Sequence, residues 1–103
     1  IHRLKKIVRP VQQALPKGTM THRGVKVDPS NIKRTALLTV EGERDDITGF
    51  GQTEAAQKLC SGLESSKKEH YLQKDVGHYG VFNGSKFRNQ IAPKIEDFIR
   101  RNV

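Results

Sequence analysis

The stretch TALLTVEG, residues 35–42, constrains the fold of this chain more than any other. It is a compact run of apolar and β-branched residues that ends at a glycine, and carboxylates follow it directly. Such a run suits a strand buried on both faces, the kind found in parallel sheets. A second strand is predicted over residues 68–76, where the side chains alternate between two faces. Between the two, residues 53–63 have helical spacing, with an apolar stripe of Ala56, Leu59, Cys60 and Leu63.

Further elements are predicted before and after this unit. Residues 1–18 have apolar residues at helical spacing, interrupted at Pro10, which predicts an amphipathic helix. Residues 20–34 predict a short hairpin-like or irregular connection, with a turn or one-turn helix that starts at Asp28. A terminal helix, with a proline near its start, is predicted from an apolar face of Phe87, Ile91, Ile95, Phe98 and Ile99.

The order of these elements predicts an α/β architecture of two parallel strands with flanking helices. Two strands cannot cover their own faces and edges, so we expect the sheet to be incomplete without a missing N-terminal part. The presence of Ile1 at the first position and of Met20 as the only methionine also predicts a piece of a longer protein. Residues 1–103 are expected to form a single fragment, with a basic helix and connection over 1–34 and a strand–helix–strand–helix unit over 35–103.

The net charge of +8 lies entirely in the first third of the chain. Residues 1–34 contain nine Lys or Arg and one acid, whereas the rest contains ten of each sign. This asymmetry predicts either a surface for an anionic partner or the solvated face of a larger protein. Aromatic residues make up 6% and there is no Trp, which argues against a nucleic-acid partner. No apolar run reaches the length of a membrane span, and the single cysteine fits a reducing cytoplasm.

Candidate catalytic residues follow each predicted strand. Asp45 comes after the first strand and His78 after the second, so parallel pairing would bring both to one edge of the sheet. A carboxylate that orients an imidazole, which then takes a proton from a nucleophile, is the arrangement that nucleophilic catalysis needs. Asp45 is favoured over Asp46 because Gly-x-x-Asp turns after a strand commonly hold the acid of α/β-hydrolases, and Glu43 is expected to face solvent.

Other reactive side chains are interpreted as structural. His70 alternates within a predicted strand, and Cys60 lies on the apolar stripe of a helix. His2 and His22 lack metal-ligand spacing, so a metal site is not expected. Acyl transfer by an acid, a histidine and a nucleophile requires no organic cofactor either, so none is expected. No Gly-x-Ser-x-Gly or Gly-x-Cys-x-Gly elbow occurs, so the nucleophile is expected outside this chain and the chain alone is expected to be inactive.

The amino-acid sequence resembles that of a known family over nearly its whole length. RTALLTVEGERDDITGFGQTEAAQKLC, VGHYGVFNGSKFRNQIAPKIEDFI and LPKGTMTHRGVKVDP are similar to the C-terminal region of bacterial intracellular poly(3-hydroxybutyrate) depolymerases. The resemblance implies an α/β-hydrolase that cuts ester bonds in cytoplasmic polyhydroxyalkanoate granules. It also implies that Asp45 and His78 are the acid and histidine of a triad whose nucleophile, Cys or Ser, belongs to the rest of the domain.

Several partners and alternatives stay open at this point. The granule and the remainder of the hydrolase domain are the expected partners, together with self-association through bare strand edges. Lys5, Lys6 and Arg9 of the basic helix are expected to help dock the enzyme on an anionic granule surface. The alternatives are a basic binding module for nucleic acid or an anionic surface, and an α/β-hydrolase for another ester.

Overall fold

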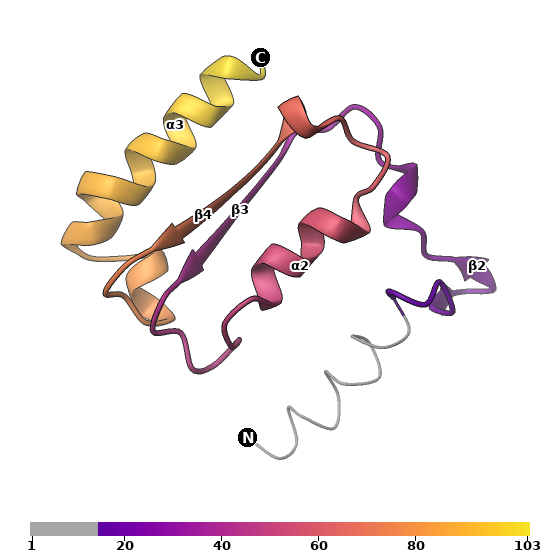
Figure 1. Cartoon of the computed structure of the whole chain (residues 1–103), viewed down its shortest axis with the longest axis horizontal. Helices are drawn as coiled ribbons and strands as arrows, with labels where there is room; N and C mark the ends of the chain where they lie inside the picture. The colour runs from indigo at the N-terminus through magenta and orange to yellow at the C-terminus, as the bar shows by residue number, and fades with distance from the viewer. Residues whose placement is uncertain (1–14) are drawn as a thin grey trace.

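Two parallel strands form the central sheet of the computed structural model, which describes residues 15–103 (Figure 1). Strand β3 (Leu37–Gly42) pairs with β4 (Lys68–Gln73) over six residues, and helix α2 (Gln52–Leu59) connects them. Parallel strands cannot be joined by a tight turn, so the chain must cross over between them, and α2 makes this crossover. The mixed arrangement of helices and strands that the sequence predicts is confirmed.

The second helix, α3 (Ala92–Arg101), lies on the opposite side of the sheet from α2 (Figure 1). A wider π-helical segment, η4 (Phe87–Ile91), leads directly into it. Pro93 lies in the first turn of α3, as the sequence predicts. Because proline has no N–H and its ring collides with the carbonyl four residues earlier, an ordinary helical turn cannot continue through it. The wide turn occurs at this point, with the N–H of Ala92 donating to the carbonyl of Phe87.

A small hairpin precedes the central sheet. Strands β1 (Thr21–His22) and β2 (Val25–Lys26) pair antiparallel. Arg23 and Gly24 between them both have positive φ, as the tightest hairpin turns require. The 3-10 turn η1 (Pro29–Asn31) follows, capped by the side chain of the residue before it. The predicted hairpin and one-turn helix are therefore both confirmed, whereas residues 1–14 of the predicted N-terminal helix lie outside the described residues.

The ends of the central elements differ from the prediction. The first strand begins at Leu37 rather than at residue 35. The second ends at Gln73 rather than at residue 76, because Asp75 has a φ of 63°, which no strand residue adopts. Helix α2 ends at Leu59, but Leu63 is still buried because a turn after the helix returns it to the core.

The core contains few apolar side chains. Among residues 15–103, the buried apolar side chains are Cys60, Leu63, Val76, Ile91 and Phe98. The expectation that the first strand is buried on both faces is only partly met, because its apolar side chains at Leu37, Leu38 and Val40 are half-buried. Polar residues are buried beside them, namely Thr39, Glu41, Asp45 and Gln73. Hydrogen bonds and ion pairs therefore accompany the apolar contacts between the sheet and its helices.

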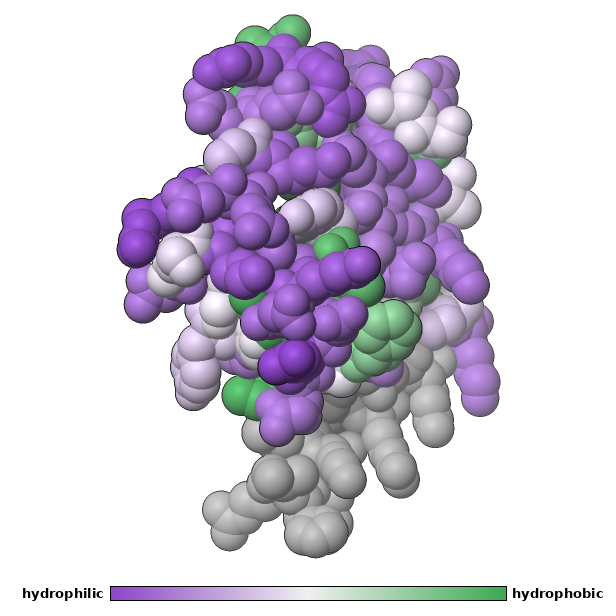
Figure 2. Space-filling view, turned by 60° about the vertical axis from the view of Figure 1, so that its left-hand side comes forward, coloured by the Kyte–Doolittle hydropathy of each residue, from purple (hydrophilic) through white to green (hydrophobic). Residues whose placement is uncertain are grey.

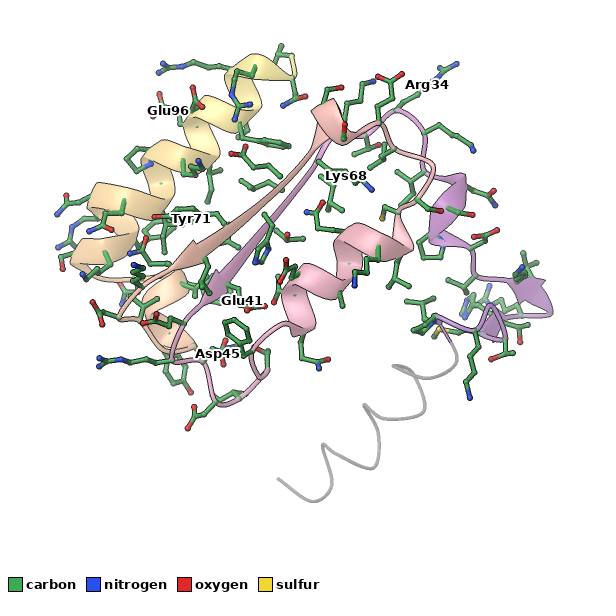
Figure 3. All side chains as sticks on the ribbon, in the orientation of Figure 1. Arg34, Glu41, Asp45, Lys68, Tyr71 and Glu96 are labelled. Carbon is green, nitrogen blue, oxygen red and sulfur yellow. The ribbon has the colours of Figure 1, made fainter. Side chains whose placement is uncertain are left out.

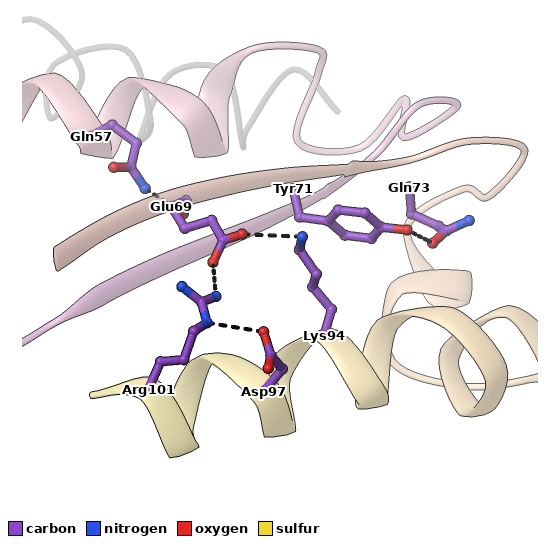
Figure 4. Close-up of polar contacts among 7 residues, drawn as sticks. All are labelled: Gln57, Glu69, Tyr71, Gln73, Lys94, Asp97 and Arg101. Carbon is purple, nitrogen blue, oxygen red and sulfur yellow. Dashed lines mark hydrogen bonds and ion pairs between the residues drawn. The ribbon is translucent and has the colours of Figure 1, made fainter. Parts of the chain in front are cut away.

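Helix α3 shows this polar packing most clearly (Figure 4). Glu69 of β4 forms ion pairs with Lys94 at 3.1 Å and Arg101 at 2.7 Å. The hydroxyl of Tyr71 donates to the side chain of Gln73 at 2.7 Å on the same face. Figure 2 turns this side of the molecule forward, and hydrophilic residues cover most of it. Among residues 15–103, no helix is long and apolar enough to cross a bilayer.

Ile91 and Ile99 provide a matched test of this core. Ile91 is completely buried and Ile99 is 56% exposed. We expect Ile91→Ala to lower the free energy of unfolding by about 2 to 5 kcal/mol, through lost burial and the cavity left behind. Ile99→Ala is expected to change it by roughly 0.5 kcal/mol or less. Urea unfolding of both variants measures the difference, and equal losses would contradict the assignment of Ile91 to the core.

Candidate active site

The two loops that follow β3 and β4 leave the sheet at the same end. Backbone hydrogen bonds continue between them after the strands stop: the N–H of Glu43 donates to the carbonyl of Gln73, and that of Arg44 to Val76, both at 2.9 Å. An exposed ion pair between Arg44 and Asp75 lies beside these bonds. The parallel pairing therefore extends into the segments that carry the predicted acid and histidine.

Gly42 lies where these two loops approach most closely. A Cβ at this position would lie 2.8 Å from the carbonyl oxygen of Val76 and 3.0 Å from that of Gly77. The first distance is shorter than real Cβ contacts and the second is tight, so a side chain here would push the two loops apart. The glycine at the end of the predicted strand thus has a second role, because it lets the two loops come together.

Asp45 is held in place within the first loop. Its N–H donates to the carbonyl of Gly42 at 3.1 Å, which closes the predicted Gly-x-x-Asp turn. Its side chain accepts the N–H groups of Ile47 and Thr48, each at 3.0 Å, and the Thr48 hydroxyl at 2.8 Å. Figure 3 shows the residue just beyond the end of β3. The carboxylate is therefore buried and oriented by the loop that carries it.

His78 completes the arrangement from the second loop. Its Nδ1 lies 2.9 Å from Oδ2 of Asp45. Burial by itself raises the pKa of Asp45, but its four hydrogen bonds, of which that with His78 contributes most, lower the pKa from 3.8 to about 2. Asp45 is therefore ionised at neutral pH. An ionised carboxylate can only accept, so Nδ1 of His78 carries the proton. In the neutral imidazole this leaves Nε2 as the atom that can take a proton from another group.

The surroundings of His78 are aromatic and open to solvent. Its side chain is 30% exposed, whereas that of Asp45 is 6% exposed. The rings of Tyr79 and Phe82 lie edge-on to the imidazole, with centroids 5.7 and 5.9 Å away, and both residues are well exposed. The histidine is thus reachable from outside, while its carboxylate partner is shielded.

The structure brings Asp45 and His78 together, and the alternative acids lie elsewhere. Asp46 and Glu43 are exposed. Glu43 accepts the N–H of Asp75 at 3.2 Å. The contact with His78 is therefore made by the carboxylate that the sequence favours, although the catalytic role of the pair stays a prediction.

The remaining candidates have structural surroundings. Nδ1 of His70 lies 2.8 Å from the hydroxyl of Thr39 on the neighbouring strand. Cys60 is buried at the end of α2, as predicted, and His22 lies in the exposed hairpin. Within the described part of the chain, no group of three or more His, Cys, Asp or Glu side chains could hold a metal ion. His2 falls outside the described residues.

Sequence reasoning missed Glu41. It lies in the apolar run that predicts β3, and the structure buries it almost completely. Its carboxylate accepts backbone N–H groups at the start of α2 (Figure 3). The sequence did contain a signal, because Glu41 is the one charged residue in a run otherwise suited to burial. A buried carboxylate is costly unless it is fully hydrogen-bonded, so its presence there predicts hydrogen-bond donors nearby.

The chain matches a known protein family over most of its length. The family model described as PHB de-polymerase C-terminus matches residues 3–103. Neither the search of curated proteins nor the search of solved structures found a match.

The hydrogen bond from His78 predicts how Asp45 titrates. We expect His78→Ala to raise the pKa of Asp45 from about 2 towards 3.8, because the largest contribution that lowers it is lost while the hydrogen bonds from Ile47 and Thr48 remain. Carbon NMR of the Asp45 carboxyl group against pH measures the midpoint. His70→Ala is the control and should leave it in place. An unchanged midpoint in His78→Ala would contradict the contact.

Acid stability follows from the same pKa. Because the folded-state pKa lies below the ordinary value of 3.8, ionised Asp45 stabilises the fold above that pH. This contribution decreases as the pH falls through about 2, where the folded-state carboxylate takes up its proton. Asp45→Asn should therefore unfold at lower urea concentration than the unchanged protein at pH 7, with the difference shrinking towards pH 2.

Gly42→Ala tests the close approach of the loops. The added methyl group must displace the backbone at Val76, so we expect a loss of about 1 to 3 kcal/mol in unfolding free energy. The downfield proton signal of His78 Nδ1 should also shift or disappear as its contact with Asp45 lengthens. Gly77→Ala is the matched control, because its Cβ would meet only an ordinary contact at 3.7 Å. Equal behaviour of the two variants would show that Gly42 has no special role.

Proposed function

Because the chain belongs to the PHB de-polymerase C-terminus family, we propose that it forms the C-terminal part of an α/β-hydrolase that cleaves ester bonds of poly(3-hydroxybutyrate). Asp45 is the proposed acid and His78 the proposed general base of its catalytic triad. The products are oligomers and monomers of 3-hydroxybutyrate. The proposed setting is the cytoplasm, at the surface of the granules that store the polymer.

One observation carries this proposal: a buried, ionised carboxylate lies 2.9 Å from Nδ1 of a partly exposed histidine. The pair lies beyond the C-terminal ends of two parallel strands, where ligands and catalytic groups collect in open α/β sheets. The acid also precedes the histidine in the chain, which is the order found in α/β-hydrolases. In this proposal, strands from the rest of the enzyme complete the sheet at an outer edge of the β3–β4 pair.

The mechanism is acyl transfer in two half-reactions. A serine or cysteine from the rest of the enzyme gives its proton to Nε2 of His78 and attacks the ester carbonyl carbon. The tetrahedral intermediate collapses, the C–O bond to the leaving alkoxide breaks, and His78 returns the proton to that oxygen. Water then attacks the acyl-enzyme, again giving a proton to His78, and the nucleophile leaves with it. Throughout, Asp45 stabilises the imidazolium and keeps the ring oriented.

The exposed rings beside His78 also support an uncharged substrate. Poly(3-hydroxybutyrate) is an aliphatic polyester whose repeating unit has a methyl group and no charge. Tyr79 and Phe82 present apolar ring surface next to the imidazole. Burying such surface against an aliphatic chain is favourable, whereas a charged substrate would require ionic partners there.

The test is release of 3-hydroxybutyrate from amorphous granules by the full-length enzyme that contains this chain. We expect His78→Ala to lower kcat by about 10²- to 10⁴-fold, the usual contribution of a general base. His22→Ala, which changes a histidine in the exposed hairpin, should leave kcat unaltered.

Three other results would change the assignment. Hydrolysis of small esters without release from granules would indicate a hydrolase for another ester. Granule hydrolysis that survives His78→Ala would exclude His78 as the general base. Absence of any hydrolysis, together with salt-sensitive binding to an anionic surface, would favour the basic binding module instead.

A further inference from the structure

We propose that Glu41 is a positioning residue, which fixes the loop of residues 43–50 and thereby sets the place of Asp45 against His78. This inference rests on the proposed function, because it assigns the loop its importance through the role of Asp45. The contacts that carry it are independent of that role.

Glu41 is 2% exposed, and its carboxylate accepts hydrogen bonds from backbone N–H groups. One oxygen accepts the N–H of Gly51 at 2.9 Å. The other accepts those of Thr53 at 3.2 Å and Glu54 at 3.4 Å. These N–H groups belong to the start of α2, where unpaired donors and the helix dipole favour a negative charge. Burial of this carboxylate is therefore compensated by three donors that have no partner within the helix.

A residue next to a helix normally caps it, but here the cap comes from a distant strand. The N-cap position is Gly51, which has no side chain and a φ of 86°. Glu41 lies ten residues earlier, at the end of β3. The contact therefore joins the strand before the loop to the helix after it. A local cap would satisfy the helix equally well without holding the loop closed.

The loop between these points carries Asp45. At its beginning, Gly42 lies against Val76 and the N–H of Arg44 donates to the Val76 carbonyl at 2.9 Å. At its end, Glu41 holds Gly51 at 2.9 Å. The loop is thus held at both ends, and between these points Ile47 and Thr48 fold back onto the Asp45 carboxylate. Loss of the contact between Glu41 and Gly51 would free the half of the loop that supplies three of the four hydrogen bonds to Asp45.

The main experiment compares Glu41→Gln with Glu69→Gln in the full-length enzyme. The amide of Glu41→Gln retains the shape but directs a donor at a backbone N–H, so this contact is weakened. We expect kcat on granules to fall about 10- to 100-fold with little change in KM, because a misplaced acid affects the chemical step more than binding. Glu69→Gln also removes a hydrogen-bonded carboxylate, on the other side of the sheet, and should leave kcat unchanged.

Proton NMR separates positioning from general stability. In Glu41→Gln the downfield signal of His78 Nδ1 should shift or broaden, whereas Glu69→Gln should retain it even if both variants unfold more easily. A folded Glu41→Gln with unaltered kcat and an unaltered signal would overturn the proposal. Should that variant fail to fold, Thr53→Pro removes one donor in the first helical turn, where proline is tolerated. It should lower kcat less but in the same direction, and an unaltered kcat would also overturn the proposal.

Failure of the proposed function gives a different result. If Asp45→Asn retains full activity, Asp45 is not the acid and no loss of kcat is expected from Glu41→Gln either. The NMR signal still reports whether Glu41 holds the contact between Asp45 and His78. The signal therefore tests the geometric inference, while kcat tests the chemistry that rests on it.

Discussion

The parallel pairing of β3 with β4 is the interaction on which the rest of this structure depends. Because the strands run in the same direction, the loops that follow them meet at one end of the sheet. Backbone bonds from Glu43 and Arg44 extend the pairing past the strands, and Gly42 allows the loops to touch. This arrangement brings Asp45 and His78, which are 33 residues apart in the chain, into contact. A shift of the register by one residue would turn their supporting side chains to the wrong faces.

Polar side chains on both faces of the sheet help to fix the register of its strands. On the side of α2, Thr39 links His70 and Gln57, and on the side of α3 Glu69 links Lys94 and Arg101. Hydrogen bonds and ion pairs require particular partners at particular distances, whereas apolar contacts tolerate displacement. Among the described residues, every buried side-chain nitrogen or oxygen has a partner. The small apolar core supplies cohesion, and the polar contacts determine which residues face one another.

Much of this arrangement could be predicted from the sequence, and the parts that could not share a cause. The strands, the crossover helix, the hairpin and the buried position of Cys60 follow from local patterns of apolar residues and turn formers. The meeting of Asp45 and His78 follows from strand order. The buried role of Glu41 and the wide turn before Pro93 could not be read locally. Both features depend on which residues of another element lie beside them, and this is decided only when the elements pack together.

The charge state of Asp45 has a consequence for how the pair responds to pH. Its pKa of about 2 means that the carboxylate stays ionised throughout the range in which the protein is expected to work. Its hydrogen bonds to Ile47 and Thr48 come from the loop itself, so part of this ionisation does not depend on His78. A loss of activity between pH 5 and 7 therefore cannot come from protonation of Asp45, and must come from another group or from unfolding. The loop thus keeps Asp45 a fixed negative charge, and in the proposed mechanism the transfer of protons belongs to His78, which this carboxylate orients.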